Sequence, residues 1–410
     1  MTHTTDLPII NIASAEFKAN PHPFYARLRA EAPVFRTLLP DKQAAWLITR
    51  YDDVLMTLKD EQRFSKDPRA AKTAAQLKKM PWVPPMLVPL TRSILDTDFE
   101  EHARLRGIIH LAFTPRRVEQ IRERAQSLAN TLLDTAERRG QMDLIHDYAL
   151  QIPLTIICEM LGIPEKDRPK FANWTKTLIN QSASPYAQLL LIPQLMLMLR
   201  YLRRLFKQRR AAPRDDLISA LATAEEGGQR LTDNELMAMV FVLIIAGHET
   251  TVNLIGSGAL ALLENPDQMR LLRQRPEVIK TAIEELLRYV SPVDQATERY
   301  AREAVTLHGV TIPKGELVLA VIASANRDEQ QFPDADRLDL TRDPAGNKHL
   351  AFGLGAHYCV GAPLARLEGQ IAIQTLAARL PNLRLAVAPR ALRWRPGITV
   401  RGLERLPTSC

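Results

Sequence analysis

The residues best suited to chemistry lie in a short glycine-rich stretch near the C-terminus, FGLGAHYCVGAPLAR at residues 352–366. It contains Cys359, with His357 two positions before it and Gly361 two positions after it. A helical pattern begins after Gly361, and the free N–H groups and dipole at a helix N-terminus stabilise a thiolate. Glycines also let a flat, bulky group lie against the main chain. The stretch therefore predicts a metal ligand, the Cys359 sulfur, held by a backbone loop.

Two other interpretations of this stretch fail on its residues. A dinucleotide-binding loop needs GxGxxG, and Tyr358 stands where the third glycine should be. A catalytic thiol needs a base, which His357 could supply, but nothing else nearby supports a cysteine protease. The chain has three cysteines, Cys158, Cys359 and Cys410, without the paired spacing of a disulfide framework or a structural zinc site. A lone thiolate also argues against an iron–sulfur cluster and leaves a porphyrin iron as the best candidate.

A long apolar stretch, residues 232–264, contains a second set of polar residues. Thr232 and Glu235 form a capping box at its start, which predicts the beginning of a helix. Because the stretch is apolar on nearly all sides, we expect it to be buried along much of its length. Glu249 and Thr250 lie in its middle, where a desolvated carboxylate is costly unless it has partners. A chance charge beside a helix-distorting threonine is the alternative.

These residues must be positioned by a mostly helical chain. Apolar spacing predicts helices at residues 101–113, 116–139, 144–161, 165–179 and 276–291. Alternating segments at residues 34–38 and 45–49 predict a hairpin, and a second alternation surrounds Gly309. An irregular, proline-rich stretch at residues 69–92 is long for a compact domain and is therefore a candidate for function. We expect a mostly α protein with small, separate β-sheets, an α+β fold, in one domain over residues 1–410.

Composition and charge limit the class of protein. With 410 residues, 46% of them hydrophobic and 24% charged, the chain is in the range of a globular protein with a large core. Its net charge of +8 could favour an acidic partner. The densest basic stretch, residues 200–210, has helical spacing with apolar residues between its charges. This spacing favours a solvated helix face over contact with nucleic acid or a membrane.

Targeting signals are not recognisable at the N-terminus, which lacks the basic and apolar regions of a secretory signal or a membrane anchor. The longest apolar runs, residues 189–199 and 236–247, fall short of the ~20 residues needed to span a bilayer. We therefore expect a cytoplasmic protein with no membrane anchor and no nucleic-acid partner.

The glycine-rich stretch carries a resemblance to a known family. It matches, at every fixed position, the haem-binding loop FGxGxHxCxGxxLAR of the cytochrome P-450 haem-thiolate monooxygenases, here of the soluble bacterial type. Three more segments follow in the order that the family requires: AGHETT at residues 246–251 resembles the distal-helix motif, EELLR has the ExxR spacing, and HARLR lies where the family places propionate ligands. The resemblance extends from Asn20 to the C-terminus. It implies the cytochrome P-450 fold, with a long central helix over a haem and a cysteine-ligand loop on the proximal side.

The resemblance also implies roles for individual residues. The cofactor would be haem b with the Cys359 thiolate as its axial ligand. Its other contacts would be His102, Arg106, Ala246, Arg299, Phe352, Gly353, His357 and Gly361. Glu249 would relay protons, and Thr250 would hydrogen-bond the bound dioxygen. Glu285 and Arg288 would form a buried pair, with Arg337 as third member, that locks the haem loop; an ordinary surface pair, worth ~0.2–0.5 kcal/mol, is the alternative. The substrate pocket would include Trp82, Met86, Val242, Ile245, Val293, Ala296 and Ile398.

The activity implied by the resemblance is hydroxylation or epoxidation of a hydrophobic small molecule with O2, such as a terpenoid, steroid, fatty acid or macrolide precursor. The chain has no flavin or NAD motif, so electrons would come from a separate ferredoxin or flavodoxin with its reductase, docking near Cys359 beside Arg104 and Arg366. We expect a monomer. A peroxide-driven peroxygenase and a non-catalytic haem sensor or carrier are the alternatives, and the presence of Glu249 and Thr250 argues against both.

Overall fold

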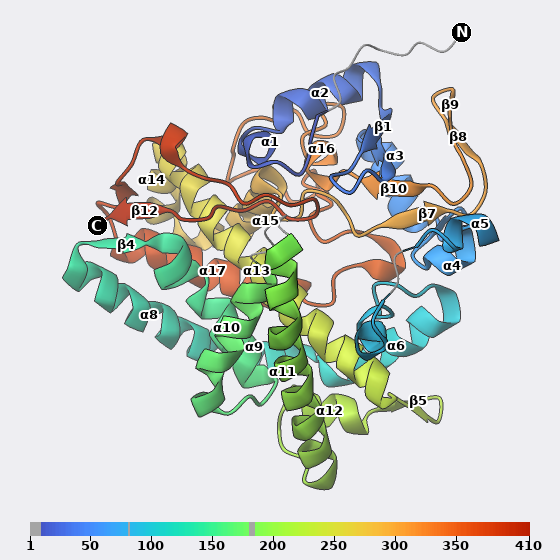
Figure 1. Cartoon of the computed structure of the whole chain (residues 1–410). Coiled ribbons are helices and arrows are strands. Elements are labelled where there is room, and N and C mark those ends of the chain that lie inside the picture. Colours follow the sequence, from blue (N-terminus) through green and yellow to red (C-terminus); the bar gives the residue numbers. More distant parts are fainter. Residues whose placement is uncertain (1–9, 81–82, 180–184) are drawn as a thin grey trace. The chain divides into compact units, whose positions relative to one another are not determined.

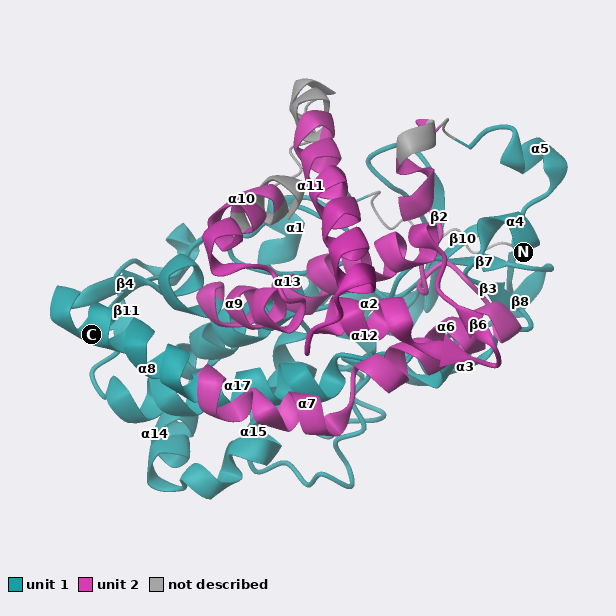
Figure 2. Cartoon of the chain, turned by 90° about the horizontal axis from the view of Figure 1, so that it is seen from below, with its two compact units in different colours: residues 1–81, 126–149, 250–410 teal, residues 82–125, 150–249 magenta. Residues whose placement is uncertain are grey.

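The protein is described by a computed structural model that covers residues 10–80, 83–179 and 185–410. Contacts divide the chain into two compact units, each assembled from separate stretches of sequence (Figure 2). The larger unit comprises Met1–Pro81, Gln126–Ala149 and Thr250–Cys410, and the smaller unit comprises Trp82–Ala125 and Leu150–Glu249. Helices predominate and the sheets are small, so the predicted α+β class is confirmed. The single domain expected from the sequence stays a prediction.

A five-stranded sheet forms the core of the larger unit (Figure 1). Its strands, in order, are β1 (Val34–Leu38), β2 (Ala44–Ile48), β10 (Leu317–Ala320), β7 (Arg299–Ala301) and β3 (Phe64–Ser65). The predicted first hairpin is confirmed, since β1 and β2 are antiparallel with Val34 opposite Ile48. In β2, Trp46 and Ile48 belong to one buried cluster while Ala45 and Leu47 belong to another, as the period of two residues in a strand requires.

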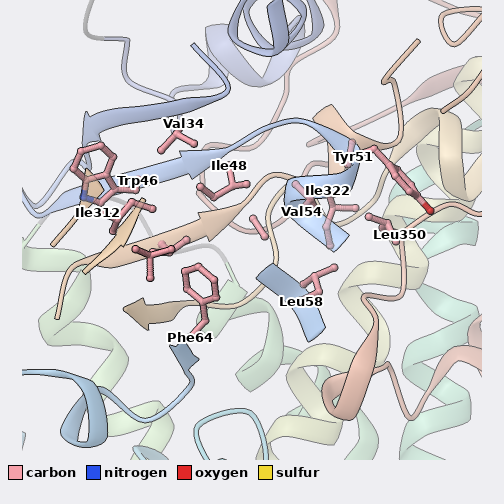
Figure 3. Close-up of a cluster of buried hydrophobic side chains, with 14 of the residues drawn as sticks. Val34, Trp46, Ile48, Tyr51, Val54, Leu58, Phe64, Ile312, Ile322 and Leu350 are labelled. Atoms are coloured by element: carbon pink, nitrogen blue, oxygen red, sulfur yellow. The ribbon is translucent and has the colours of Figure 1, made fainter. Parts of the chain in front are cut away.

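The first of these clusters reaches the segment that carries Cys359. Figure 3 shows Trp46, Ile48 and Phe64 packed with Val54 and Leu58 of α3 (Tyr51–Lys59). Leu350, which lies just before the glycine-rich stretch, is buried in the same cluster. Apolar packing therefore fixes both the end of α3 and the start of the loop that follows Leu350.

Two smaller sheets complete the β structure of the larger unit. One joins β11 (Arg384–Leu385), β12 (Pro407–Ser409) and β4 (Gln141–Asp143). The other is the predicted hairpin around Gly309, formed by β8 (Val305–Leu307) and β9 (Val310–Ile312). His308 and Gly309 have φ angles of 50° and 76°, the left-handed pair that a two-residue type I′ turn requires.

Several helices of the larger unit surround these sheets (Figure 1). They are α1 (Ala15–Ala19), α2 (His22–Glu31), α3, α4 (Pro68–Ala71), α5 (Ala74–Leu77), α14 (Pro266–Gln274), α15 (Ile279–Val290), α16 (Ile322–Ala325) and α17 (Ala362–Arg379). The helix α8 (Arg122–Arg139) begins in the smaller unit and continues into the larger one. Short 3-10 turns stand at Pro276–Val278, Gly355–His357 and Pro389–Ala391.

Four predicted helices are divided in the structure, and two of them, at residues 165–179 and 276–291, only in that each begins with a 3-10 turn. Residues 116–139 form α7 (Pro115–Gln120) and α8, and residues 144–161 form a π-helical turn (Leu144–Ala149) followed by α9 (Gln151–Met160). The second division has a physical cause in Pro153, whose ring would clash with the carbonyl of Ala149 in a continuous α-helix. Proline is tolerated in the first turn of a helix, where Pro153 now lies.

Among its described residues, the smaller unit has helices and one short hairpin, β5 (Glu225–Glu226) and β6 (Gln229–Arg230). Its helices include α6 (Phe99–Ala112), α7, α9, α10 (Arg168–Ile179), α11 (Pro185–Ala211) and α12 (Leu217–Thr223), with 3-10 turns at Pro85–Leu90 and Glu165–Asp167. The prediction for residues 69–92 was wrong in part, because α4, α5 and the turn at Pro85–Leu90 lie in that stretch.

The long helix α13 (Asp233–Glu264) belongs to both units, which divide between Glu249 and Thr250. Its predicted capping box is confirmed: the Thr232 amide donates to Glu235 Oε2 at 2.8 Å, and the Glu235 amide donates to Thr232 Oγ1 at 3.2 Å. By length and composition alone α13 could cross a membrane, but 56% of its most apolar window is buried, as in the core helix of a soluble protein.

Candidate functional site

The loop that carries Cys359 is shaped by its own backbone hydrogen bonds. The Cys359 amide donates to the Phe352 carbonyl at 2.9 Å, and the Gly353 amide donates to the Leu350 carbonyl at 2.8 Å. Gly353 and Gly355 have φ angles of +67° and +78°, which favour glycine. A Cβ atom on Gly355 would also lie 3.0 Å from the Leu58 carbonyl oxygen. These two glycines therefore serve the fold of the loop itself, in addition to the close approach of a flat group that the sequence suggested.

The side chain of Cys359 is exposed, at the point where α17 begins. Gly361 caps that helix, and the Ala362 amide donates to the Cys359 carbonyl at 3.4 Å. Cys158 is buried in the smaller unit, and burial raises the pKa of its thiol to about 12, so it stays protonated. Cys359 is thus the thiol that combines exposure with a helix N-terminus, the environment that favours a thiolate ligand.

Two basic side chains of the larger unit lie at the same end of α3. His357 lies 3.7 Å from a carboxylate oxygen of Glu61, and only 7% of its side chain is exposed. The buried guanidinium of Arg299 donates to the Leu58 carbonyl at 3.4 Å, the oxygen that also faces Gly355. Buried basic groups beside this loop are suited to carboxylates such as haem propionates.

An ionic cluster that sequence reasoning missed supports the loop from its other side. Arg366 of α17 donates to both carboxylate oxygens of Glu284, at 2.7 and 2.8 Å, and its Nη1 donates to the Tyr358 hydroxyl at 3.1 Å. The guanidinium also lies over the Phe352 ring, 4.4 Å from its centre. Burial alone would raise the pKa of Glu284, but hydrogen bonds from Arg366 and His349 hold it at about 2. The only sequence signal was that Glu284 and Arg366 lie inside the EELLR and LAR motifs.

The sequence predicts that Arg366 and Arg104 contact a ferredoxin or flavodoxin that docks near Cys359. In the structure Arg366 is paired with Glu284, and Arg104, in the smaller unit, is paired with Glu235 of the capping box. Both guanidinium groups are half-buried in these pairs. Each charge therefore has a partner within the chain, and docking at these two residues stays a prediction.

The ExxR residues form a buried pair in the larger unit. Glu285 and Arg288 have fully buried side chains, and Arg288 donates to each carboxylate oxygen at 2.8 Å. Arg288 also donates to three backbone carbonyls, those of Asn326 at 2.9 Å, Ala335 at 2.7 Å and Arg337 at 3.1 Å. This burial excludes the surface-pair alternative.

The third member of this pair is corrected by the structure. Arg342, rather than Arg337, donates to Glu285 Oε2 at 3.1 Å. The carbonyl of Arg337 points to Arg288 while its side chain is exposed. Arg342 is held in place because its guanidinium also donates to the carbonyls of Pro333 and Asp334.

In the smaller unit, His102 and Arg106 lie one turn apart on α6, and therefore on the same face of the helix. His102 is buried, and Arg106 is half-buried with its Nε donating to the His110 ring at 2.9 Å. Burial and the nearby Arg106 lower the pKa of His110. Because His102 and Arg106 are four positions apart on α6, both side chains can contact a single anionic group.

The middle of α13 differs from its two ends. Residues 236–240 and 251–262 are buried, whereas Ala246 is exposed. The predicted residues Val242, Ile245, Glu249 and Thr250 are half-buried, and with Ala246 they recur at the spacing of one helix face. His248, on another face, is buried, and its Nδ1 lies 2.6 Å from the Ile244 carbonyl. In a largely buried helix this face thus combines less buried apolar positions with one acid and one hydroxyl, while Phe241, Leu243 and Gly247 on its other faces are half-buried as well.

The predicted pocket residues of the larger unit are half-buried. Val293 and Ala296 pack on the cluster of Figure 3, and Ile398 packs on the cluster at the other face of the sheet. Their two segments pair with each other, since Val293 forms an antiparallel bridge with Val400. Trp82 lies outside the described residues, as does the side chain of Met86.

Comparison with known proteins places the chain in a family. The family model for cytochrome P450 matches residues 6–380. The vitamin D(3) 25-hydroxylase of Pseudonocardia autotrophica is 44% identical over 408 residues, covering 99% of this chain and 98% of the relative. The cytochrome P450 monooxygenase PikC of Streptomyces venezuelae is 42% identical, covering 98% and 95%. The solved structure of cytochrome P450 PksS of Bacillus subtilis has a TM-score of 0.90 at 41% identity, covering 98% of this chain and 99% of that one.

The chain belongs to the cytochrome P450 family, and its fold is the fold of that family. It is accordingly a monooxygenase of the kind that hydroxylates or epoxidises its substrate, with a haem that a cysteine thiolate ligates. The residues present fit this cofactor: Cys359 is the exposed one of the three cysteines, and the buried basic groups of Arg299 and His357 lie in the same unit.

Proposed function

We propose that the chain holds haem b through the Cys359 thiolate and uses it to insert one oxygen atom of O2 into a C–H or C=C bond of a hydrophobic small molecule. The observation that carries this proposal is the position of Cys359, an exposed residue presented at a helix N-terminus by a loop with its own hydrogen bonds. The thiolate-ligated haem supplies the activation of oxygen when bound.

The side chains of the protein hold the cofactor, offset the charges of its propionates and transfer protons. His102, Arg106, Arg299 and His357 offset the charges of the two propionates. Glu285, Arg288 and Arg342 fix the segment before the loop, because Arg288 binds three of its carbonyls. Glu249 would exchange protons with solvent, and the Thr250 hydroxyl would relay a proton towards the substrate side, releasing its own proton as it accepts another.

The substrate is a hydrophobic molecule the size of a macrolide, steroid or fatty acid. The apolar, half-buried positions support this class: Val242, Ile245, Val293, Ala296 and Ile398. Relatives support it too, since they include a vitamin D(3) 25-hydroxylase and a mycinamicin IV hydroxylase/epoxidase, and a structure related at 40% identity is described as a complex with myristic acid. Electrons come from a ferredoxin or flavodoxin with its reductase, and the enzyme acts as a cytoplasmic monomer.

The test uses purified protein and two variants. Reduced wild-type protein with carbon monoxide should give the red-shifted Soret band of sulfur-ligated iron, and Cys359→Ser should lose it; a variant that kept the band would refute the role of Cys359. With a surrogate reductase, Thr250→Ala should lower the share of NADPH oxidation that yields product. Unchanged coupling would refute the role of Thr250, and equal product from peroxide alone would favour a peroxygenase.

A further inference from the structure

A buried ion pair lies in the larger unit, outside the residues assigned above. Lys18 of α1 and Asp294 pair with each other, and both side chains are completely buried. The Tyr25 hydroxyl donates to both carboxylate oxygens of Asp294, at 3.1 and 3.2 Å. Burying two charges is costly, and pairs of this kind often add little to stability compared with apolar residues of the same volume. We therefore ask whether this ion pair fixes the position of the backbone segments that it joins.

The pair joins two short stretches of chain that carry predicted substrate contacts, residues 292–296 and 398–401, here called the two wall segments. Lys18 Nζ donates to the Ile398 carbonyl at 3.0 Å, and the Asp294 amide donates to the Thr399 carbonyl at 2.8 Å. One charged partner thus belongs to the first wall segment, and the other holds the backbone of the second.

The two wall segments are anchored in different ways. The first is attached to the sheet, because the Ala296 amide donates to the Ala320 carbonyl at 2.9 Å and the Ala323 amide donates to the Asp294 carbonyl at 3.0 Å. The second is held by the N-terminal stretch of the chain: the Gly397 amide donates to the Ala13 carbonyl at 2.9 Å, next to the bond from Lys18 to Ile398. The backbone around Ile398 is therefore held from two sides, by Lys18 and Ala13 at the N-terminal stretch and by the first wall segment through Asp294 and the bridge from Val293 to Val400.

The end of α1 is in turn fixed by the second wall segment. Arg401 Nε donates to the Lys18 carbonyl at 2.8 Å, and its guanidinium lies over the Trp394 ring, 3.9 Å from the centre. The Arg401 amide donates to the Pro292 carbonyl at 3.0 Å, which closes the circuit back to the first wall segment. These bonds form a closed ring through α1 and the two wall segments, with Lys18 and Asp294 at its centre.

We propose that Lys18 and Asp294 are positioning residues that set substrate selectivity: the ion pair fixes Ile398 relative to Val293 and so sets the distance between the two apolar walls. The inference rests on the proposed function, because it takes Val293, Ala296 and Ile398 as substrate contacts. It assigns to α1 a part in choosing between slim and bulky substrates, although neither charged group touches the substrate.

The test compares wild type with the double variant Lys18→Met/Asp294→Asn, which removes both charges at nearly constant shape. Dissociation constants for lauric acid and testosterone are measured from the Soret shift, and their ratio is the readout. Because one methylene of fit in a hydrophobic pocket is worth ~10–200-fold in discrimination between substrates, we expect the ratio to change ~10-fold or more. The carbon monoxide band should stay at the wild-type position. The matched control is Arg27→Met/Glu31→Gln, an exposed ion pair on α2 that should leave the ratio unchanged.

Each outcome bears on the inference. An unchanged ratio with an intact carbon monoxide band overturns it and leaves the proposed function standing. A wild-type protein without that band overturns the proposed function, and this inference with it. If the double variant does not fold, Lys18→Gln/Asp294→Asn, which keeps two neutral hydrogen-bonding groups in place of the charges, is measured in the same way; a ratio shifted at least threefold supports the inference and an unchanged ratio overturns it.

Discussion

Glu368 of α17 offers a test of whether a buried carboxyl is protonated in the folded protein. Its side chain is completely buried in the larger unit, and burial raises the pKa of its carboxyl from 4.5 to about 8. The Thr251 hydroxyl of α13 offsets this rise only in part, and no cation among the described residues contributes. Glu368 is therefore protonated in the folded protein at neutral pH. The variant Glu368→Gln keeps the shape and removes the titration.

The sign of the pH effect follows from the direction of this pKa change. Between pH 4.5 and about 8, the folded chain holds a proton on Glu368 that the unfolded chain has released. Each pH unit in that window therefore lowers the free energy of unfolding by about 1.4 kcal/mol through this group. Below pH 4.5 both states are protonated and above about pH 8 both are ionised, so the slope from Glu368 vanishes outside the window.

The assay is thermal unfolding of the haem-loaded protein at several pH values. From pH 5 to pH 8 wild type loses on the order of 4 kcal/mol through Glu368, relative to Glu368→Gln. At ~2.1 cal/mol/K of unfolding entropy per residue, a chain of 410 residues shifts its Tm by about 1 °C per kcal/mol. The Tm of the variant should therefore rise by about 4 °C relative to wild type over this range. A Tm difference between the two proteins that is the same at every pH does not affect this readout.

The control for this experiment is Glu31→Gln, which alters an exposed glutamate of α2. Its Tm relative to wild type should show no comparable trend with pH. A Tm difference between Glu368→Gln and wild type that stays flat from pH 5 to pH 8 would show that Glu368 is ionised in the folded protein, and the reasoning from burial would be refuted.

Two further predictions concern the loop and the ExxR pair. Gly355→Ala should destabilise the protein by about 1–3 kcal/mol and lower its haem content, because the left-handed backbone is strained and the new Cβ meets the Leu58 carbonyl at 3.0 Å. Gly140→Ala has similar strain, at φ +66°, but no atom within 4 Å, so an equal loss of stability and haem there would contradict a role for the contact. Arg342→Ala should cost about 1–3 kcal/mol in urea unfolding, because Glu285 loses a buried partner, whereas Arg337→Ala should stay within about 0.5 kcal/mol; the reverse order would refute the correction.

The sequence predicted what depends on short spacing. The capping box at Thr232, the hairpin around Gly309 and the pairing of Glu285 with Arg288 each involve residues a few positions apart, and the structure contains all three. The position of Cys359 before a helix follows from the same local reasoning.

What the sequence could not predict depends on how distant segments meet. Lys18 and Asp294 are 276 positions apart, so no spacing rule relates them. The choice of Arg342 over Arg337 was missed because it depends on which way the backbone turns after Ala335, where the Arg337 carbonyl rather than its side chain faces Arg288. From the sequence, a single acid such as Glu368 in an amphipathic helix is expected on the solvent-exposed face. Only the packing of the structure shows that Glu368 is buried.

The buried cations of the larger unit share one use. Arg288 donates to the carbonyls of Asn326, Ala335 and Arg337, Lys18 donates to that of Ile398, and Arg299 donates to that of Leu58. Most of these carbonyls lie in irregular segments, which lack the regular hydrogen bonds of helices and strands and would otherwise leave buried acceptors unsatisfied. A long cationic side chain can satisfy them without adding a strand, and two of these three cations, Lys18 and Arg288, are also paired with buried acids. The charges in this core are therefore best explained as fixing the loops near Cys359 and the two wall segments, whose shape the small sheets alone do not determine.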